Sequence, residues 1–109
     1  MGHTLGSHTH THYSSANLWE KEMDFELTEP KFVLKKLAGA EIFSFSYPFG
    51  EPMDCLPAYQ RIKKYKLYRY AFTIEPKVNT ASTDHLDLGR YSPNSKETPD
   101  DIIRRLKDL

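Results

Sequence analysis

The stretch "EIFSFSYPFG", residues 41–50, is the clearest strand signal in this chain of 109 residues, and its neighbours are arranged around it. Aromatic and aliphatic side chains alternate with serine, which is typical of a β-strand because successive side chains point to opposite faces. Pro48 cannot donate to a sheet and so marks the end of the strand, while Gly50 permits a sharp turn directly after it.

Helical patterns flank this strand on both sides in the sequence. Before it, apolar residues within 15–37 recur at spacings of three and four: Met23, Leu27, Pro30, Leu34 and Leu37. Pro30 removes a backbone donor, so we expect a kink there or a break near residues 28–29. Gly39 is a typical helix stop. After the strand, residues 53–65 are expected to form a second, shorter helix.

The rest of the sequence adds strands and a final helix. Residues 66–76 are aromatic and β-branched, which predicts a strand, and residues 85–92 predict a shorter one. The helix predicted over 98–109 begins with Thr98 as N-cap and Pro99 at the first helical position. With a short strand expected within residues 1–14, strands and helices alternate. This alternation indicates βα units and a largely parallel sheet, hence an α/β fold.

Composition limits the classes of function. The chain has 15 basic and 15 acidic residues, a formal net charge of zero that argues against nucleic-acid binding. No run approaches the ~18 apolar residues that span a bilayer, and no apolar signal-peptide core is visible, which leaves the compartment unknown. The single cysteine, Cys55, excludes an internal disulfide and is expected to pack as a small apolar group.

The stretch "GSHTHTHYS", residues 6–14, holds the densest set of reactive side chains. Unlike the uninterrupted run of a purification tag, its three histidines alternate with threonine: His8, His10 and His12. In an extended chain roughly 6.6 Å separates alternate residues, too far for three to share one ion. A bend at residues 9–11 would bring His8 and His12 together, held by threonine hydroxyls. Two convergent imidazoles favour a transition metal, although a catalytic zinc site usually takes three protein ligands.

Four segments, in order along the chain, match the motifs of one protein family. Residues 2–12, "GHTLGSHTHTH", correspond to a Gly-His-x-x-Gly-(Asn/Ser) lead-in followed by His-(Ser/Thr)-x-x-His, the second motif. Residues 45–50 contain the third motif in its Tyr-Pro-(Tyr/Phe)-Gly form. The segments "YKLYRYAFTIEP" and "DHLDLGRYS" are similar to the later "GY…AFT…EPG" and "DPLRLPRI" elements. Together these segments resemble the polysaccharide deacetylase homology domain of carbohydrate esterase family 4.

The resemblance implies a distorted (β/α) barrel that hydrolyses N-acetyl, or sometimes O-acetyl, groups on a sugar polymer. It implies that His8 and His12 bind a divalent metal, commonly zinc, together with an aspartate, and that Thr9 supports the loop between them. The expected partner is an acetylated polysaccharide or oligosaccharide. Members of the family are often extracytoplasmic.

The later motifs imply the rest of the site. The resemblance places an oxyanion-stabilising backbone N–H near Tyr47. It also implies a wall for the sugar ring made by Tyr47, Pro48 and Phe49, although the two aromatic rings can equally pack in a core. The family's general-acid histidine has no clear counterpart here. His85 lies in the right half of the chain, but its neighbours do not match.

Two departures from the family pattern qualify the expected function. The first motif, an Asp-Asp pair that supplies the catalytic base and the third metal ligand, should precede residue 2, and Ser46 stands where an arginine is usual. A closed eight-stranded barrel takes about 250 residues, whereas this sequence supplies about four strands. We therefore expect residues 1–109 to form one incomplete deacetylase domain, inactive alone, that needs the missing N-terminal half or self-association.

Two alternatives stay open at this stage. The first is a non-catalytic homologue that binds metal or carbohydrate. The second is an unrelated small domain with a histidine-rich leader.

Overall fold

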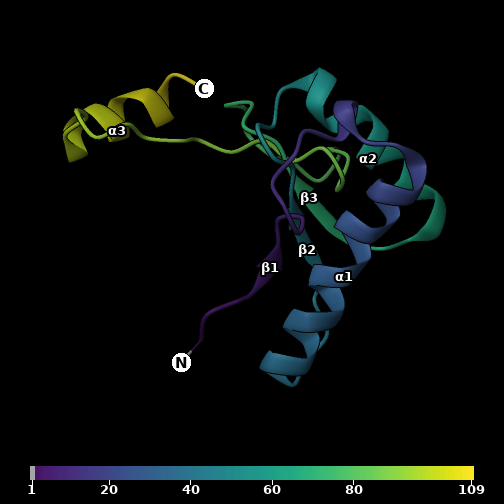
Figure 1. The fold of residues 1–109 in the computed structure, drawn as a ribbon. Coiled ribbons are helices and arrows are strands. Elements are labelled where there is room, and N and C mark those ends of the chain that lie inside the picture. The colour runs from purple at the N-terminus through teal and green to yellow at the C-terminus, as the bar shows by residue number, and fades with distance from the viewer. Residues whose placement is uncertain (1) are drawn as a thin grey trace.

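The computed structural model describes residues 2–109, which form three helices and a three-stranded sheet (Figure 1). In chain order the elements are β1 (Gly6–Ser7), a 3-10 turn η1 (Ser15–Asn17), α1 (Glu20–Ala38), β2 (Ser44–Ser46), α2 (Pro52–Tyr65), β3 (Tyr70–Phe72) and α3 (Pro99–Lys107). The predicted α/β class is confirmed. Within the described residues the sheet has three strands, whereas a closed (β/α) barrel has eight.

All three strands run parallel, in the order β1-β2-β3. Phe45 of β2 lies between Ser7 of β1 and Ala71 of β3. The strand predicted over residues 85–92 is reduced to a single bridge between Phe72 and Leu88. Because the strands are parallel, their carboxyl ends lie at the same edge of the sheet. At this edge β1 leads into the histidine-bearing segment and β2 leads into the "YPFG" segment.

The break predicted near residues 28–29 is wrong, because α1 is continuous from Glu20 to Ala38. Pro30 is buried with Met23 and Leu27 on one face of the helix. Burying each large apolar side chain contributes about 1.5–3 kcal/mol, which offsets the hydrogen bond that proline cannot make. The helix ends as predicted at Gly39, which adopts a left-handed φ of 69° and donates its N–H to the Lys35 carbonyl.

The core lies where α1 and α2 cover one face of the sheet (Figure 1). At its centre the Phe45 ring lies 5.4 Å from the Tyr47 ring and 5.1 Å from the Tyr68 ring. The polar tips of both tyrosines are satisfied: Tyr47 donates to the Leu86 carbonyl at 2.7 Å and Tyr68 to the Leu27 carbonyl at 2.6 Å. Core packing and the hydrogen bond of Tyr47 therefore fix the position of the end of β2, which leads into the "YPFG" segment.

The C-terminal helix α3 forms as predicted but stands apart from the sheet, at the end of an extended segment (Figure 1). The Thr98 hydroxyl accepts from the Asp101 N–H, and the Asp101 carboxylate accepts from the Thr98 N–H. Apolar side chains of this segment are exposed: Ile103, Leu106 and Leu109. Within residues 2–109, no helix combines the length and apolar character that crossing a membrane requires.

The buried Tyr68 hydroxyl should make the fold sensitive to alkaline pH. Burial raises the pKa of Tyr68 from 10.0 to about 12. Above its ordinary pKa the unfolded chain releases this proton while the folded chain retains it. The contribution to the free energy of unfolding is therefore complete below pH 10 and falls as the pH rises toward 12.

Urea unfolding at about pH 8 and about pH 11 measures this fall. The variant Tyr68→Phe should make the fall shallower, with the buried Cys55 thiol contributing to what remains, whereas Tyr65→Phe, at an exposed position, should leave the fall unchanged. An equally steep alkaline loss in Tyr68→Phe would show that other groups cause it.

Candidate functional site

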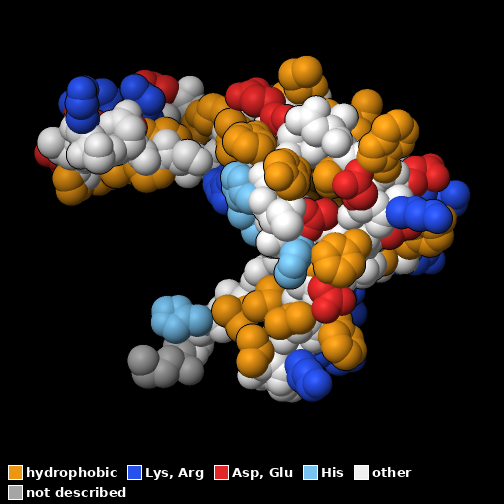
Figure 2. Space-filling view, in the orientation of Figure 1, with side chains coloured by type: hydrophobic (Ala, Val, Ile, Leu, Met, Phe, Trp, Pro, Cys, Tyr) orange, Lys and Arg blue, Asp and Glu red, His pale blue; other side chains and the backbone are white. Residues whose placement is uncertain are grey.

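The turn after β1 brings two histidine rings together. Thr9 and His12 adopt left-handed backbone conformations, with φ of 67° and 65°. The His12 N–H donates to the Thr9 hydroxyl at 3.1 Å, the hydroxyl-to-backbone bond expected to hold the bend. The rings of His8 and His12 meet edge to face, with their centroids 4.7 Å apart. Both residues are exposed, and Figure 2 shows histidine side chains along the hollow between α3 and the N-terminal residues.

A hydrogen bond to β2 orients His8. Its Nδ1 lies 2.6 Å from the Ser46 carbonyl oxygen, which can only accept. Nδ1 therefore carries the proton, and the lone pair is on Nε2. Metal-ligating histidines usually donate their second ring nitrogen to a carbonyl or carboxylate in this way. His8 is thus in the tautomer that leaves Nε2 available to a metal.

His10 and His85 lie elsewhere. The centroid of the His10 ring lies 5.1 Å from that of Phe25, so this ring packs against α1 rather than with His8 and His12. His85 lies beside Tyr70 at the beginning of β3, with their rings 5.6 Å apart, and its carbonyl accepts from the Ala71 N–H. His8 and His12 follow the carboxyl end of β1, whereas His85 lies beside the amino end of β3. The structure therefore does not bring His85 to the histidine pair.

Within residues 2–109, no group of three or more histidine, cysteine, aspartate or glutamate side chains is placed to hold a metal ion. His8 and His12 therefore constitute a two-histidine set, which fits a metal in donor type and tautomer but falls one ligand short of the usual three.

The "YPFG" segment places its three residues differently. Phe49 is 56% exposed, has a left-handed φ of 67°, and its ring meets the His12 ring at 5.0 Å. Tyr47 is 1% exposed and Pro48 is also fully buried. This corrects the wall predicted from Tyr47, Pro48 and Phe49, because only the Phe49 side chain faces outward beside the histidines.

The backbone hydrogen bonds of this segment limit which N–H near Tyr47 can be the predicted oxyanion donor. The Tyr47 N–H donates to the Phe72 carbonyl at 3.1 Å within the sheet, and Pro48 has no N–H. In the part of the chain that the structure describes, the Phe49 N–H has no acceptor. Within residues 2–109, the first backbone N–H after Tyr47 that has no acceptor is therefore that of Phe49, whose ring contacts His12.

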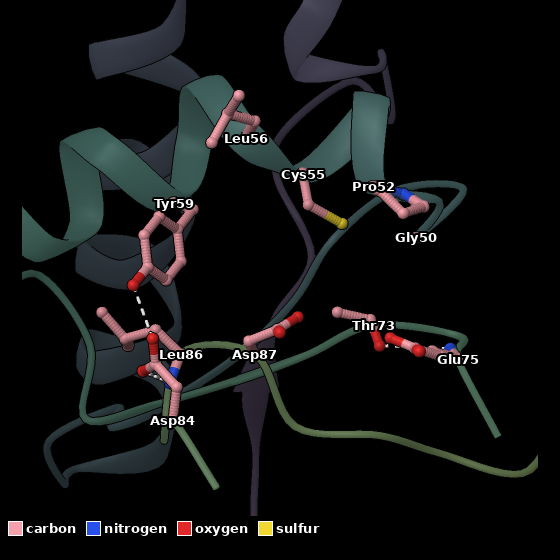
Figure 3. A pocket seen from close by; sticks show the side chains of 10 residues that line it. All are labelled: Gly50, Pro52, Cys55, Leu56, Tyr59, Thr73, Glu75, Asp84, Leu86 and Asp87. Atoms are coloured by element: carbon pink, nitrogen blue, oxygen red, sulfur yellow. Dashed lines mark hydrogen bonds between the residues drawn. The ribbon is translucent and has the colours of Figure 1, made fainter. Parts of the chain in front are cut away.

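A separate cavity of about 250 Å³ lies between α2 and residues 84–87 (Figure 3). The Tyr59 hydroxyl donates to Asp84 and lowers the pKa of that carboxyl, and Asp87 pairs with Lys77 at 3.2 Å. Cys55 points into the cavity, and burial raises the pKa of its thiol to about 12. Asp84 and Asp87 thus have partners in this cavity, and within residues 2–109 neither joins His8 and His12 in a group that could hold a metal ion.

Glu26 of α1 is a contributor to the site that the sequence did not reveal. It is buried, and its carboxylate accepts from the N–H groups of His10 and Thr11, at 3.0 and 3.1 Å, and from the Thr11 hydroxyl. The sequence held one indication of this burial. Glu26 comes three residues after Met23, a spacing that places both on the core-facing side of the helix. An acidic residue at such a position needs buried hydrogen-bond partners.

Solved structures with the same fold include several deacetylases. PplD of Streptococcus pyogenes, a deacetylase solved in complex with acetate, matches 93% of this chain with a TM-score of 0.73 and 18% identity. BC0361, a polysaccharide deacetylase from Bacillus cereus, matches 94% with a TM-score of 0.73 and 21% identity. IcaB from Ammonifex degensii matches 95% with a TM-score of 0.64 and 24% identity. These likenesses establish the fold.

The chain spans 43%, 32% and 47% of the lengths of those three structures, respectively. None of the curated proteins matches it significantly. The sequence model of the polysaccharide deacetylase family matches residues 1–68, more than half of the chain, including both histidines, the "YPFG" segment and α2. The chain belongs to the polysaccharide deacetylase family.

Proposed function

We propose that this chain is part of a metal-dependent hydrolase that removes N-acetyl, or O-acetyl, groups from a polysaccharide. His8 and His12 are the proposed ligands of a divalent metal, most simply zinc. The observation that carries the proposal is the convergence of the two imidazoles, with centroids 4.7 Å apart, while the Ser46 carbonyl holds the proton-bearing Nδ1 of His8. Imidazole nitrogens suit zinc and related transition metals.

A divalent metal bound there supplies Lewis-acid polarisation of the acetyl carbonyl and a water of lowered pKa. The chain's own residues supply orientation. Ser46 fixes the His8 ring. We assign to the Phe49 N–H, which has no acceptor within residues 2–109, the role of donating to the carbonyl oxygen as negative charge develops on it. The exposed Phe49 ring offers an apolar surface on which a sugar ring can stack beside the histidines.

The third ligand and the proton-accepting carboxylate are not supplied by a cluster within residues 2–109. We propose that another part of the protein, or a second copy, provides them. Residues 1–109 alone should then bind metal without hydrolysing acetyl groups. The partial sheet, with no strand paired to the outer edge of β1 in the described residues, fits an incomplete barrel of this kind.

Zinc binding to residues 1–109 tests the histidine pair. We expect a dissociation constant on the order of micromolar by calorimetry. His8→Ala should weaken binding at least tenfold, since loss of even an outer-shell partner costs about 10–100-fold. His10→Ala is the matched control, because its ring lies against Phe25, and it should leave the affinity unchanged. Equal losses in the two variants would contradict the assignment of the pair.

A non-catalytic metal-binding homologue is the second candidate, favoured by the two-ligand set. Acetate release from a chitooligosaccharide, measured on the longest natural form of the protein, separates the two functions. Release that His12→Ala abolishes supports the hydrolase. Zinc binding without release in that form supports the binding protein.

A further inference from the structure

Glu26 is a buried carboxylate whose hydrogen-bond partners all belong to the turn that carries the histidines. Only 4% of the residue is exposed. Burying an ionised carboxylate is unfavourable unless donors surround it. Here the donors are the consecutive N–H groups of His10 and Thr11 and the Thr11 hydroxyl. The carboxylate therefore ties the middle of the turn to α1.

The turn needs such an attachment because its backbone is strained. Thr9 and His12 both adopt the left-handed conformation, with φ of 67° and 65°, although neither is glycine. Residues with a Cβ atom adopt this conformation at a cost and keep it only where the surroundings enforce it. The two strained residues lie on either side of the two N–H groups that Glu26 holds.

The two histidines also differ in how they are held. The His8 ring is anchored directly by its hydrogen bond to the Ser46 carbonyl. Within the described residues, the His12 ring has no hydrogen bond and touches the rings of His8 and Phe49. The position of His12 thus depends on the backbone of the turn rather than on a side-chain partner.

We propose that Glu26 is a positioning residue that holds residues 9–12 in the shape that brings His12 to His8. It does not touch the pair and acts through the N–H groups of His10 and Thr11. For its consequence in metal binding, the inference rests on the proposed function. For the shape of the turn it stands on the contacts of Glu26 alone.

Two measurements on the 109-residue chain test this role. Glu26→Gln keeps the length of the side chain but replaces one acceptor oxygen with an amide donor. Zinc affinity should fall about tenfold, comparable to the loss of an outer-shell partner. Without metal, the His10 and Thr11 N–H groups should exchange with solvent faster, as measured by NMR. Thr11→Val, which removes only the hydroxyl donor, should weaken zinc binding in the same direction but less.

The matched control is Met23→Ala, one turn away on the same buried face of α1. It destabilises the helix packing without touching the turn, so zinc affinity should stay close to that of the wild type. A double-mutant cycle adds a readout that a merely structural role would not move. In the His12→Ala background, Glu26→Gln should cause no further loss of zinc affinity.

The outcomes are distinct. Glu26→Gln with unchanged amide exchange and unchanged zinc affinity overturns the inference, and so does an equal loss of affinity in Met23→Ala. If the wild type binds no zinc while Glu26→Gln still speeds exchange at His10 and Thr11, the proposed metal function is overturned and the positioning of the turn is supported.

Discussion

Phe45→Ala is expected to lower the free energy of unfolding by about 3–5 kcal/mol, the usual cost of removing a buried aromatic ring. Phe45 is 1% exposed and lies at the centre of the core, between the rings of Tyr47 and Tyr68. Domains typically have only about 5–15 kcal/mol of stability, so this loss should remove a large share of the free energy of unfolding and lower the urea midpoint. Urea unfolding followed by far-UV circular dichroism measures it.

Phe43→Ala is the matched control for this prediction. Phe43 lies two residues earlier, is 41% exposed, and has the Arg69 guanidinium over its ring at 4.3 Å. Its loss removes partly exposed surface and one cation–π contact, together about 1 kcal/mol. Equal destabilisation by the two variants would mean that the core is not centred on Phe45.

Gly50→Ala is expected to destabilise the chain by about 2–4 kcal/mol, because two costs add. Gly50 has a φ of 77°, which disfavours any residue with a Cβ atom. A Cβ atom there would also lie 2.7 Å from Ile74 Cγ2 and 2.8 Å from the Ile74 backbone nitrogen. The backbone cannot retreat freely, since the Ile74 N–H donates to the Gly50 carbonyl at 3.3 Å.

Gly39→Ala separates the two costs. Gly39 has a similar φ of 69°, but a Cβ atom there would meet nothing within 4 Å. We expect only the conformational cost of about 1 kcal/mol, in the same unfolding assay. If Gly39→Ala is as destabilising as Gly50→Ala, the close approach of Ile74 has no energetic consequence. Gly50 is next to Phe49, whose ring contacts His12, so Gly50→Ala should weaken zinc binding indirectly. The effect should be smaller than that of His8→Ala, which removes a proposed ligand.

The element order was predictable because each signal is local. Alternation of Phe and Ser in residues 41–50, the 3–4 spacing of apolar residues before Gly39, and the Thr98–Pro99 start each depend on neighbouring residues. The pairing of His8 with His12 was predictable for the same reason, since the bend joins residues only four apart. Local preference also erred where packing overrode it, as at Pro30, which remains inside a continuous helix.

By itself the sequence determined the βα alternation, the parallel sheet, the left-handed end of α1 and the two histidines that can meet. Only the tertiary structure decided which groups surround them. The Ser46 carbonyl orients His8 from 38 residues away, Glu26 holds the turn from α1, and Tyr47 is buried while Phe49 is exposed. These are contacts between distant segments, and they depend on how the helices pack on the sheet, which no local pattern encodes.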